Sequence, residues 1–184
     1  MAAPGTVPLP DLDAWLPRAA VRTHHRREVA APAGAAWRVA RELKLRDTRT
    51  LGRLVRWRIP GTPATATYEE LFRRYPFTVL DEGELHLVSG LCGRIWTLAR
   101  DYPHLTGADE FAAWNRRGTV RVLFAHWVVP LDRERAELCS EARVAPVDRV
   151  SAARLKALWR VIGRFEPLVA SEPLSVVARR VDDR

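Results

Sequence analysis

Two long stretches with alternating side chains, in the second half of the chain, constrain the fold most. Residues 119–130 and 135–144 both read as β-strands, and Asp132-Arg133-Glu134 between them is typical of a short connection. Strands this close in sequence pair antiparallel. A shorter hairpin is predicted around Asp81-Glu82-Gly83-Glu84, with strands on either side of that turn. The sequence therefore predicts an antiparallel sheet.

An amphipathic helix is predicted directly after the long hairpin. From about residue 149 to 166, apolar residues recur at steps of three and four, the period of one helix face. A twisted sheet must cover its apolar face, and this helix is the natural cover. We expect four of its residues to face the sheet: Leu155, Trp159, Ile162 and Phe165.

The first half of the chain is predicted to supply an edge strand and short helices. Residues 21–30 alternate as a strand but are rich in polar side chains, as an edge strand is. A short helix is expected over residues 34–43, and Asp47 is the expected N-cap of the next. Thr67 and Glu70 have the spacing of a capping box, which predicts a third helix start.

The predicted fold class is α+β: a curved antiparallel sheet wrapped around a long C-terminal helix, with short helices near the N-terminus. Residues 1–19, with four prolines, are expected to form an irregular leader. Residues 20–184 are expected to form a single domain. A domain of this size can bury roughly 70% of its unfolded surface, so it needs no disulfide or metal to fold.

The formal charge of +8 invites a nucleic-acid interpretation, which the distribution of charge disfavours. All but two of the 30 basic residues are arginine, the exceptions being Lys44 and Lys156, and this is the bias of a GC-rich coding sequence. The arginines are scattered and mostly alternate with apolar residues, whereas a phosphate-binding surface concentrates its charge on one face. An arginine-rich module for nucleic acid or protein is kept as an alternative.

Several functional classes lack their signatures. Cys92 and Cys139 are isolated from each other and from histidine pairs, which argues against a zinc site. The first residues lack the features of a signal peptide, and no apolar run is long enough to span a membrane. No nucleotide-binding, serine-hydrolase or metalloprotease motif is present. We expect a cytoplasmic protein without cofactor or metal; the oligomeric state stays open, a homodimer included.

Short motifs spread over residues 20–180 resemble the START-like (SRPBCC) superfamily, within it an uncharacterised bacterial subgroup. The resemblance rests on Glu28-Val29-Ala30-Ala31-Pro32, Ala36-Trp37, Arg41-Glu42-Leu43, Leu51-Gly52, Gly90-Leu91-Cys92-Gly93-Arg94 with Trp96, Ser140-Glu141-Ala142-Arg143-Val144, Asp148, Leu158-Trp159-Arg160-Val161-Ile162 and Pro167. It implies a helix-grip fold around a ligand cavity. Because that fold hosts carriers, receptors and polyketide cyclases, it implies no single activity.

The long hairpin offers a candidate site. If Leu131 pairs with Ala136, His126 lies opposite Glu141, and Arg143 shares their face. A carboxylate beside the imidazole would raise its basicity, as a general base requires, and Arg143 would hold a carbonyl or carboxylate of the ligand. The other interpretation is an ion pair on the solvent side of the sheet. A shift of one residue in the register would exchange the faces.

The expected function is the binding of a small apolar or aromatic molecule, similar to a lipid or polyketide, in an internal cavity. Five aromatic residues are the candidates for its walls: Trp37, Trp96, Trp127, Trp159 and Tyr75. Simple core packing is an equal alternative for each tryptophan. An enzyme is the second function class, in which His126 and Glu141 would serve a cofactor-independent cyclase, dehydratase or other lyase.

Overall fold

The computed structural model describes residues 8–97, 101–163 and 166–182. Five antiparallel strands form one sheet in the order β1-β5-β4-β3-β2. Their bounds are β1 Val21–Val29, β2 Thr78–Gly83, β3 His86–Gly93, β4 Val120–Pro130 and β5 Ala136–Pro146. The long hairpin β4–β5 therefore lies at the centre of the sheet, and β1 is an edge strand, as its polar sequence predicts.

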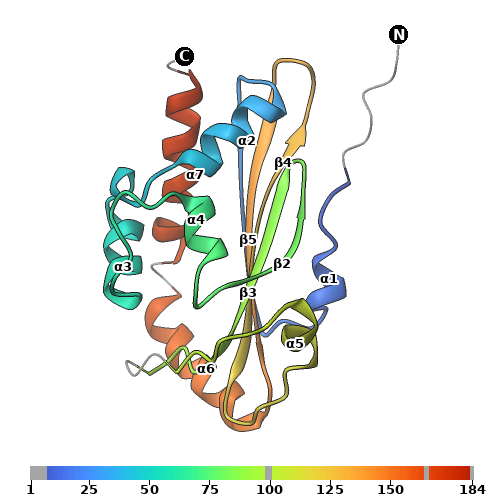
Figure 1. The fold of residues 1–184 in the computed structure, drawn as a ribbon, viewed down its shortest axis with the longest axis vertical. Helices are drawn as coiled ribbons and strands as arrows, with labels where there is room; N and C mark the ends of the chain where they lie inside the picture. The colour runs from blue at the N-terminus through green and yellow to red at the C-terminus, as the bar shows by residue number, and fades with distance from the viewer. Residues whose placement is uncertain (1–7, 98–100, 164–165, 183–184) are drawn as a thin grey trace.

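Helices cover both faces of this sheet (Figure 1). One side carries α2 (Ala33–Glu42), α3 (Thr50–Arg58), α4 (Tyr68–Arg73) and α7 (Glu166–Asp182), together with the 3-10 turn Leu45–Asp47. The other side carries α1 (Leu12–Trp15) and α5 (Ala108–Ala113), and α6 (Arg149–Ile162) lies at one end. We call the side facing α2 and α7 the inner face and the other the outer face. The α+β fold with a C-terminal helix on an antiparallel sheet is the predicted one.

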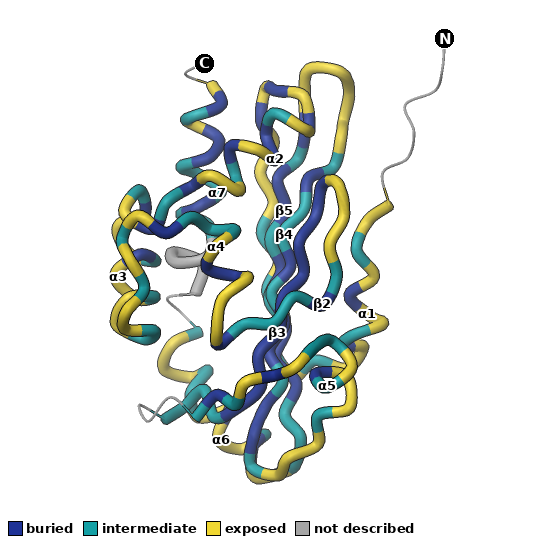
Figure 2. The backbone as a smooth tube through the Cα atoms, in the orientation of Figure 1, coloured by how far each residue is buried: buried dark blue, intermediate teal, exposed yellow. Residues whose placement is uncertain are grey.

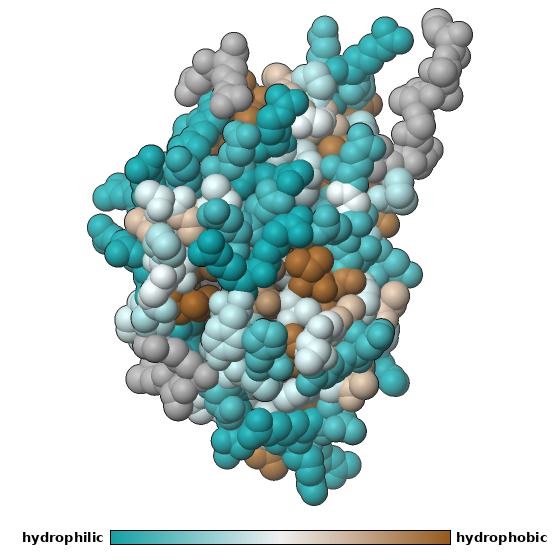
Figure 3. Space-filling view, viewed as in Figure 1, coloured by the Kyte–Doolittle hydropathy of each residue, from teal (hydrophilic) through white to brown (hydrophobic). Residues whose placement is uncertain are grey.

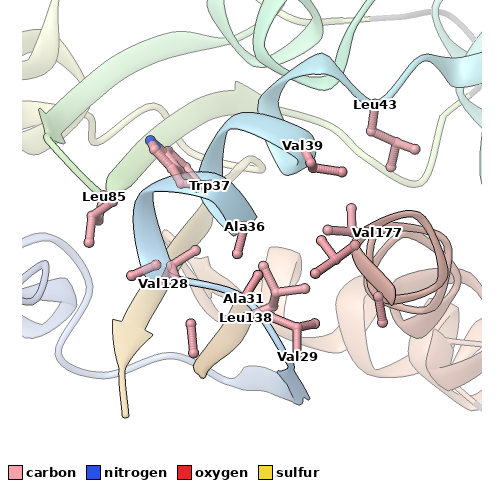
Figure 4. Close-up of a cluster of buried hydrophobic side chains, with 14 of the residues drawn as sticks. Val29, Ala31, Ala36, Trp37, Val39, Leu43, Leu85, Val128, Leu138 and Val177 are labelled. Atoms are coloured by element: carbon pink, nitrogen blue, oxygen red, sulfur yellow. The ribbon is translucent and has the colours of Figure 1, made fainter. Parts of the chain in front are cut away.

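The main core lies between the inner face and α2 and α7. Val177 and Ala178 of α7 are buried with Trp37 of α2 against Val128 and Leu138 of the central strands. Figure 4 shows Trp37, Val128, Leu138 and Val177 among the buried side chains between the helices and the sheet. The smaller core of the outer face joins Leu12 and Leu16 to Phe111 of α5 and to Leu123. Residues 8–19, predicted to be irregular, thus contain a short helix that contributes to the core.

The helix predicted from residue 149 to 166 is present as α6, but it ends at Ile162, and a separate helix, α7, packs on the inner face. Gly163 closes α6, and α7 begins at Glu166 with Pro167 in its first turn, where proline is tolerated. Leu155 is buried as expected, but Trp159 is only half-buried and Ile162 is 41% exposed. Phe165 lies outside the described residues. The helix that packs on the inner face is α7, which has more contact with β1 and α2 than α6 has with the sheet.

Of the two predicted helix starts, one is confirmed and the other is wrong. Thr67 and Glu70 form the expected capping box, each side chain accepting a bond from the other residue's backbone N–H. Asp47 does not cap α3; its carboxylate accepts from Lys44 N and pairs with Arg180. The carboxylate of Glu172 on α7 caps α3 instead, because it accepts bonds from the N–H groups of residues 49–51 at 2.6–3.2 Å.

Candidate functional site

The register of β4 and β5 decides which side chains share a face. Pro130, not Leu131, pairs with Ala136, so the predicted register is off by one residue. His126 consequently lies opposite Ser140, and Glu141 lies opposite Ala125. His126 is on the inner face while Glu141 is on the outer face, so the predicted His126–Glu141 pair does not form. Both faces of this hairpin carry apolar residues and are covered by helices. The alternation of polar and apolar residues therefore does not show which face is inward, so it does not fix the register.

His126 lies in an aromatic cluster on the inner face. Its ring centroid is 4.6 Å from that of Phe72 and 5.8 Å from that of Tyr68, both residues of α4. Phe77 and Phe124 complete the cluster by packing on Phe72. Burial lowers the pKa of His126 to about 4, because the surrounding rings disfavour the charged imidazolium. The imidazole is therefore neutral at pH 7, the opposite of the raised basicity predicted beside Glu141.

Three buried polar atoms on this side of the sheet have no hydrogen-bond partner among the described residues. They are Nε2 of His126, Oγ of Ser89 and Nε1 of Trp96. Ser89 pairs with Phe124 across β3 and β4, which places it beside the aromatic cluster. Trp96 packs against the buried cluster that contains Leu91 and Val122, and Arg154 of α6 lies over its ring at 5.9 Å. More than nine in ten buried polar groups in proteins have a partner, so each of these atoms is an exception.

The side chains in the middle of the inner face are more exposed to solvent than those in the middle of the outer face. Phe124 and His126 on β4, and Ser140 and Ala142 on β5, are all half-buried. Outward-facing neighbours in the same strands, such as Leu123 and Arg143, are buried. Figure 2 shows the same mixture of half-buried and buried positions along β4 and β5. Ser140, the cross-strand partner of His126, and Ala142 both have small side chains.

Two open pockets lie at the borders of the inner side. The α3–α4 pocket, about 280 Å³, is lined by Arg58 to Pro63 and by Leu71, Tyr75 and Tyr102, among others. Leu71 precedes Phe72 in α4, so this helix separates the pocket from the aromatic cluster. The β1–α6 pocket, about 450 Å³, is lined by Val21, Leu155 and Trp159, among others. Both pockets are open to solvent, and the predicted internal cavity stays a prediction.

Glu141 and Arg143 belong to a buried ionic network on the outer face. Arg143 Nε donates to Glu141 at 2.6 Å, and Arg143 Nη1 donates to Asp13 at 2.5 Å and to the carbonyl of Leu16 at 2.9 Å. Arg22 on β1 pairs with Glu141 at 2.8 Å. Glu141 and Arg143 are 2% and 3% exposed, so their charges need these partners. The network joins α1 to the sheet and lies on the opposite face from His126.

The aromatic residues proposed as cavity walls are distributed over several environments. Trp37 is a core residue between α2 and the sheet, and Trp127 lies on the outer face, stacked on His24 at 5.5 Å. Tyr75 lines the α3–α4 pocket and donates from its hydroxyl to the carbonyl of Tyr102 at 2.7 Å. Trp159 lines the β1–α6 pocket, and Trp96 packs against the inner face. The residues around His126 that the sequence did not single out are chiefly Phe72 and Ser89; Ser89 carried no signal at all.

Neither a metal-binding cluster nor a membrane-spanning helix occurs in the part of the chain that the structure describes. No group of three or more His, Cys, Asp or Glu side chains is placed to hold a metal ion there. None of the helices within those residues has the length and apolar character needed to cross a bilayer.

The comparisons with known proteins concern the fold. No family model matches the chain, and no curated protein matches it. Solved structures similar to it include a hypothetical protein from Helicobacter pylori, at 11% identity over 98% of this chain and 99% of that one, with a TM-score of 0.44. An aromatase/cyclase from Streptomyces sp. R1128 is 17% identical over 88% and 95% of the two chains, with a TM-score of 0.36.

A third similar structure is the oxygenase of carbazole 1,9a-dioxygenase, solved with bound fluorene and its ferredoxin. It is 10% identical over 88% of this chain and 47% of the oxygenase chain, with a TM-score of 0.42. This chain thus spans about half the length of that oxygenase. With TM-scores below 0.5, these likenesses stay at the level of the general fold and assign neither a ligand nor an activity.

Proposed function

We propose that the chain binds a small, neutral, largely apolar or aromatic molecule against the inner face of its sheet. The single observation that carries this proposal is the set of unpartnered polar atoms on that face: His126 Nε2, Ser89 Oγ and Trp96 Nε1. A buried polar atom without a partner costs about 1–3 kcal/mol. A ligand that brings a hydrogen-bonding group among these atoms recovers that free energy.

The surroundings of His126 define the chemistry of the ligand. Phe72, Tyr68 and Phe124 offer ring faces and edges, which favour an aromatic or flat apolar body. The imidazole is neutral at pH 7, so it pairs best with a neutral hydroxyl or carbonyl group. The sequence resemblance to the START-like superfamily agrees with a ligand-binding role.

A binder is favoured over a cyclase or dehydratase. General-base catalysis works best when the pKa of the base lies near the operating pH, and burial takes the pKa of His126 to about 4. The carboxylate that would raise it, Glu141, lies on the outer face and is already paired with Arg22 and Arg143. His126 and Glu141 therefore do not assemble into an acid–base pair, and we propose His126 as a ligand-binding residue.

The test is calorimetric titration with two probes of nearly equal size, 2-naphthol and naphthalene. Because a buried hydrogen bond is worth about 1–3 kcal/mol relative to an unmet partner, 2-naphthol is expected to bind about tenfold more tightly or better. His126→Phe keeps an aromatic ring but removes the ring nitrogens, so it is expected to remove most of the difference in affinity between the two probes. Trp127→Phe, on the outer face, is the matched control and should leave it unchanged.

Two results of the titrations would contradict the proposed ligand site. Equal binding of both probes to the unmodified protein would mean that water satisfies His126 and Ser89, and it would contradict a hydrogen-bonding ligand site. Absence of binding by either probe would contradict an aromatic ligand on this face. Native mass spectrometry of the purified protein adds an independent check, since a co-purifying apolar molecule that is lost in His126→Phe supports the proposal.

A further inference from the structure

Helix α3 presents an exposed face that combines large apolar side chains with arginine. Trp57 is 62% exposed and Leu54 is 44% exposed, and they lie one turn apart. Arg53 and Arg56 are exposed beside them. The opposite side of the helix is held to the body, since a Cβ on Gly52 would lie 2.1 Å from the carbonyl oxygen of Leu45. The exposed face of α3 therefore does not pack against the rest of the described chain.

The charge of this face is positive and uncompensated. Residues 49–58 contain four arginines and no acidic residue. Within the residues that the structure describes, Arg53 and Arg56 form no ion pair, whereas exposed arginines elsewhere, such as Arg41 and Arg73, are paired with carboxylates. Of the other two, Arg58 lies over the ring of Tyr102 at 5.1 Å and so points toward the body. Arg53 and Arg56 remain available to an external anion.

This face adjoins the mouth of the α3–α4 pocket. Arg58, Ile59 and Pro60, which follow Trp57 directly, line that pocket. Tyr75, on the same pocket, is 53% exposed. Figure 3 shows that the visible surface over α3 and α4 is mostly hydrophilic, with apolar residues in small separate patches. The exposed side chains of Leu54 and Trp57 thus lie beside arginines, next to the mouth of the α3–α4 pocket.

We propose that this face of α3, defined by Arg53, Leu54, Arg56 and Trp57, docks the protein peripherally on an anionic lipid bilayer. Amphipathic helices that lie on membranes place Trp and Leu at the boundary between headgroups and acyl chains, with Arg on the polar side. Each arginine near an anionic surface contributes about 1 kcal/mol of attraction. Docking in this way brings the mouth of the α3–α4 pocket to the lipid surface.

Two other partners fit the face less well. The phosphate backbone of a nucleic acid would match Arg53 and Arg56, but it offers no continuous apolar phase for Leu54 and Trp57. A second copy of the chain, meeting this face about a twofold axis, would bring the same arginines together and repel itself. An anionic bilayer satisfies the apolar and the charged side chains at once.

The experiment is co-sedimentation of the full chain with vesicles of phosphatidylcholine alone or with phosphatidylglycerol at one part in three. Binding is expected to the phosphatidylglycerol vesicles only, and to weaken with salt. The double variant Arg53→Gln/Arg56→Gln should lower the partition coefficient about 25-fold, at about fivefold for each charge removed. Trp57→Ala should lower it on the order of tenfold, as burial of a large apolar side chain implies.

The matched control removes the same charge elsewhere. Arg117→Gln/Arg133→Gln changes two exposed arginines that lie outside α3 and form no ion pair within the described residues. It should change binding less than about threefold, because distant charges are screened. Equal losses in the two double variants would overturn the proposal, since binding would then follow net charge. Retained vesicle binding in Trp57→Ala and the α3 double variant would also overturn it.

Two further readouts identify the rival partners. Loss of binding to a double-stranded DNA oligonucleotide in Arg53→Gln/Arg56→Gln, without vesicle binding by the unmodified chain, would assign the face to nucleic acid. A dimer in sedimentation velocity that Trp57→Ala dissociates would assign it to a second copy. Because vesicle binding is measured without 2-naphthol or naphthalene, its failure leaves the proposed ligand site to be judged by its own titrations.

Discussion

His126 and Ser140 are direct cross-strand partners at the centre of the sheet, and both side chains lie on the inner face, where His126 contacts α4. This pairing separates the imidazole from the carboxylate of Glu141 by the thickness of the sheet. It leaves the imidazole among the rings of Tyr68 and Phe72, with a small hydroxyl side chain as its neighbour. The proposed ligand site and the ionic network therefore occupy opposite faces of the same two strands.

The lowered pKa of His126 predicts a specific dependence of stability on pH. An unfolded histidine takes up a proton below pH 6.5, whereas the folded one does so only near pH 4. Protonation thus favours the unfolded chain between these values, so the free energy of unfolding falls with pH from about 6.5 to 4, by up to about 3 kcal/mol from this group.

Urea unfolding of the unmodified protein and of His126→Phe at pH 7 and pH 4.5 measures this contribution. The variant should lose less stability than the unmodified chain on acidification. At pH 7 it should be at least as stable, since it removes an unpartnered buried nitrogen. Identical losses on acidification would mean that His126 is hydrated or paired in the folded state.

The network on the outer face predicts unequal effects of its members. Arg143→Met leaves the buried carboxylate of Glu141 with Arg22 alone, so a loss of about 3–5 kcal/mol in the free energy of unfolding is expected. Asp13→Asn changes a carboxylate whose side chain is 71% exposed and should have a much smaller effect. A large effect of Asp13→Asn would instead assign the docking of α1 to this one pair. Thermal unfolding of the two variants makes the comparison.

The cap that α7 provides to α3 is testable by one substitution. Glu172→Ala removes the acceptor of the first N–H groups of α3 and should lower the free energy of unfolding by about 1–2 kcal/mol. Hydrogen exchange of the α3 amides should increase at the same time. Glu134→Ala, at the exposed tip of the β4–β5 hairpin, is the control; a similar change in α3 exchange there would contradict a specific cap.

Two glycines in helices predict opposite results for the same substitution. A Cβ on Gly52 would lie 2.1 Å from the backbone oxygen of Leu45, so Gly52→Ala must push α3 away from the Leu45–Asp47 turn and is expected to destabilise the fold. A Cβ on Gly34 in α2 meets nothing within 4 Å. Gly34→Ala should therefore stabilise the protein by about 0.5–1 kcal/mol. Chemical denaturation distinguishes the two signs.

The parts of this structure that were predictable are those set by local chemistry. The capping box of Thr67 and Glu70 and the polar edge strand β1 follow from side chains and their immediate neighbours, and both are confirmed. The fold class follows from the order of such elements. These features depend little on what the rest of the chain does.

The wrong predictions concern relations that local patterns do not determine. Apolar residues continue through residues 149–169 with helical spacing, so the pattern does not reveal that the helix ends at Gly163. It also does not reveal that α7, rather than α6, packs on the inner face. In β4 and β5 both faces are apolar because α1 and α5 cover the outer one, so alternation does not fix the register. The cap of α3 by Glu172 joins residues more than 120 positions apart, beyond any local motif.

The most direct test of the ligand site is the nuclear magnetic resonance signal of the His126 imidazole nitrogens during addition of 2-naphthol. A hydrogen bond from a ligand hydroxyl to an otherwise unpartnered Nε2 changes the shielding of that nitrogen strongly. We expect a saturable shift of the His126 Nε2 resonance with 2-naphthol, a much smaller one with naphthalene, and none at His24 on the outer face. An unchanged His126 resonance at saturating 2-naphthol, or a shift confined to His24, would contradict a binding site on the inner face.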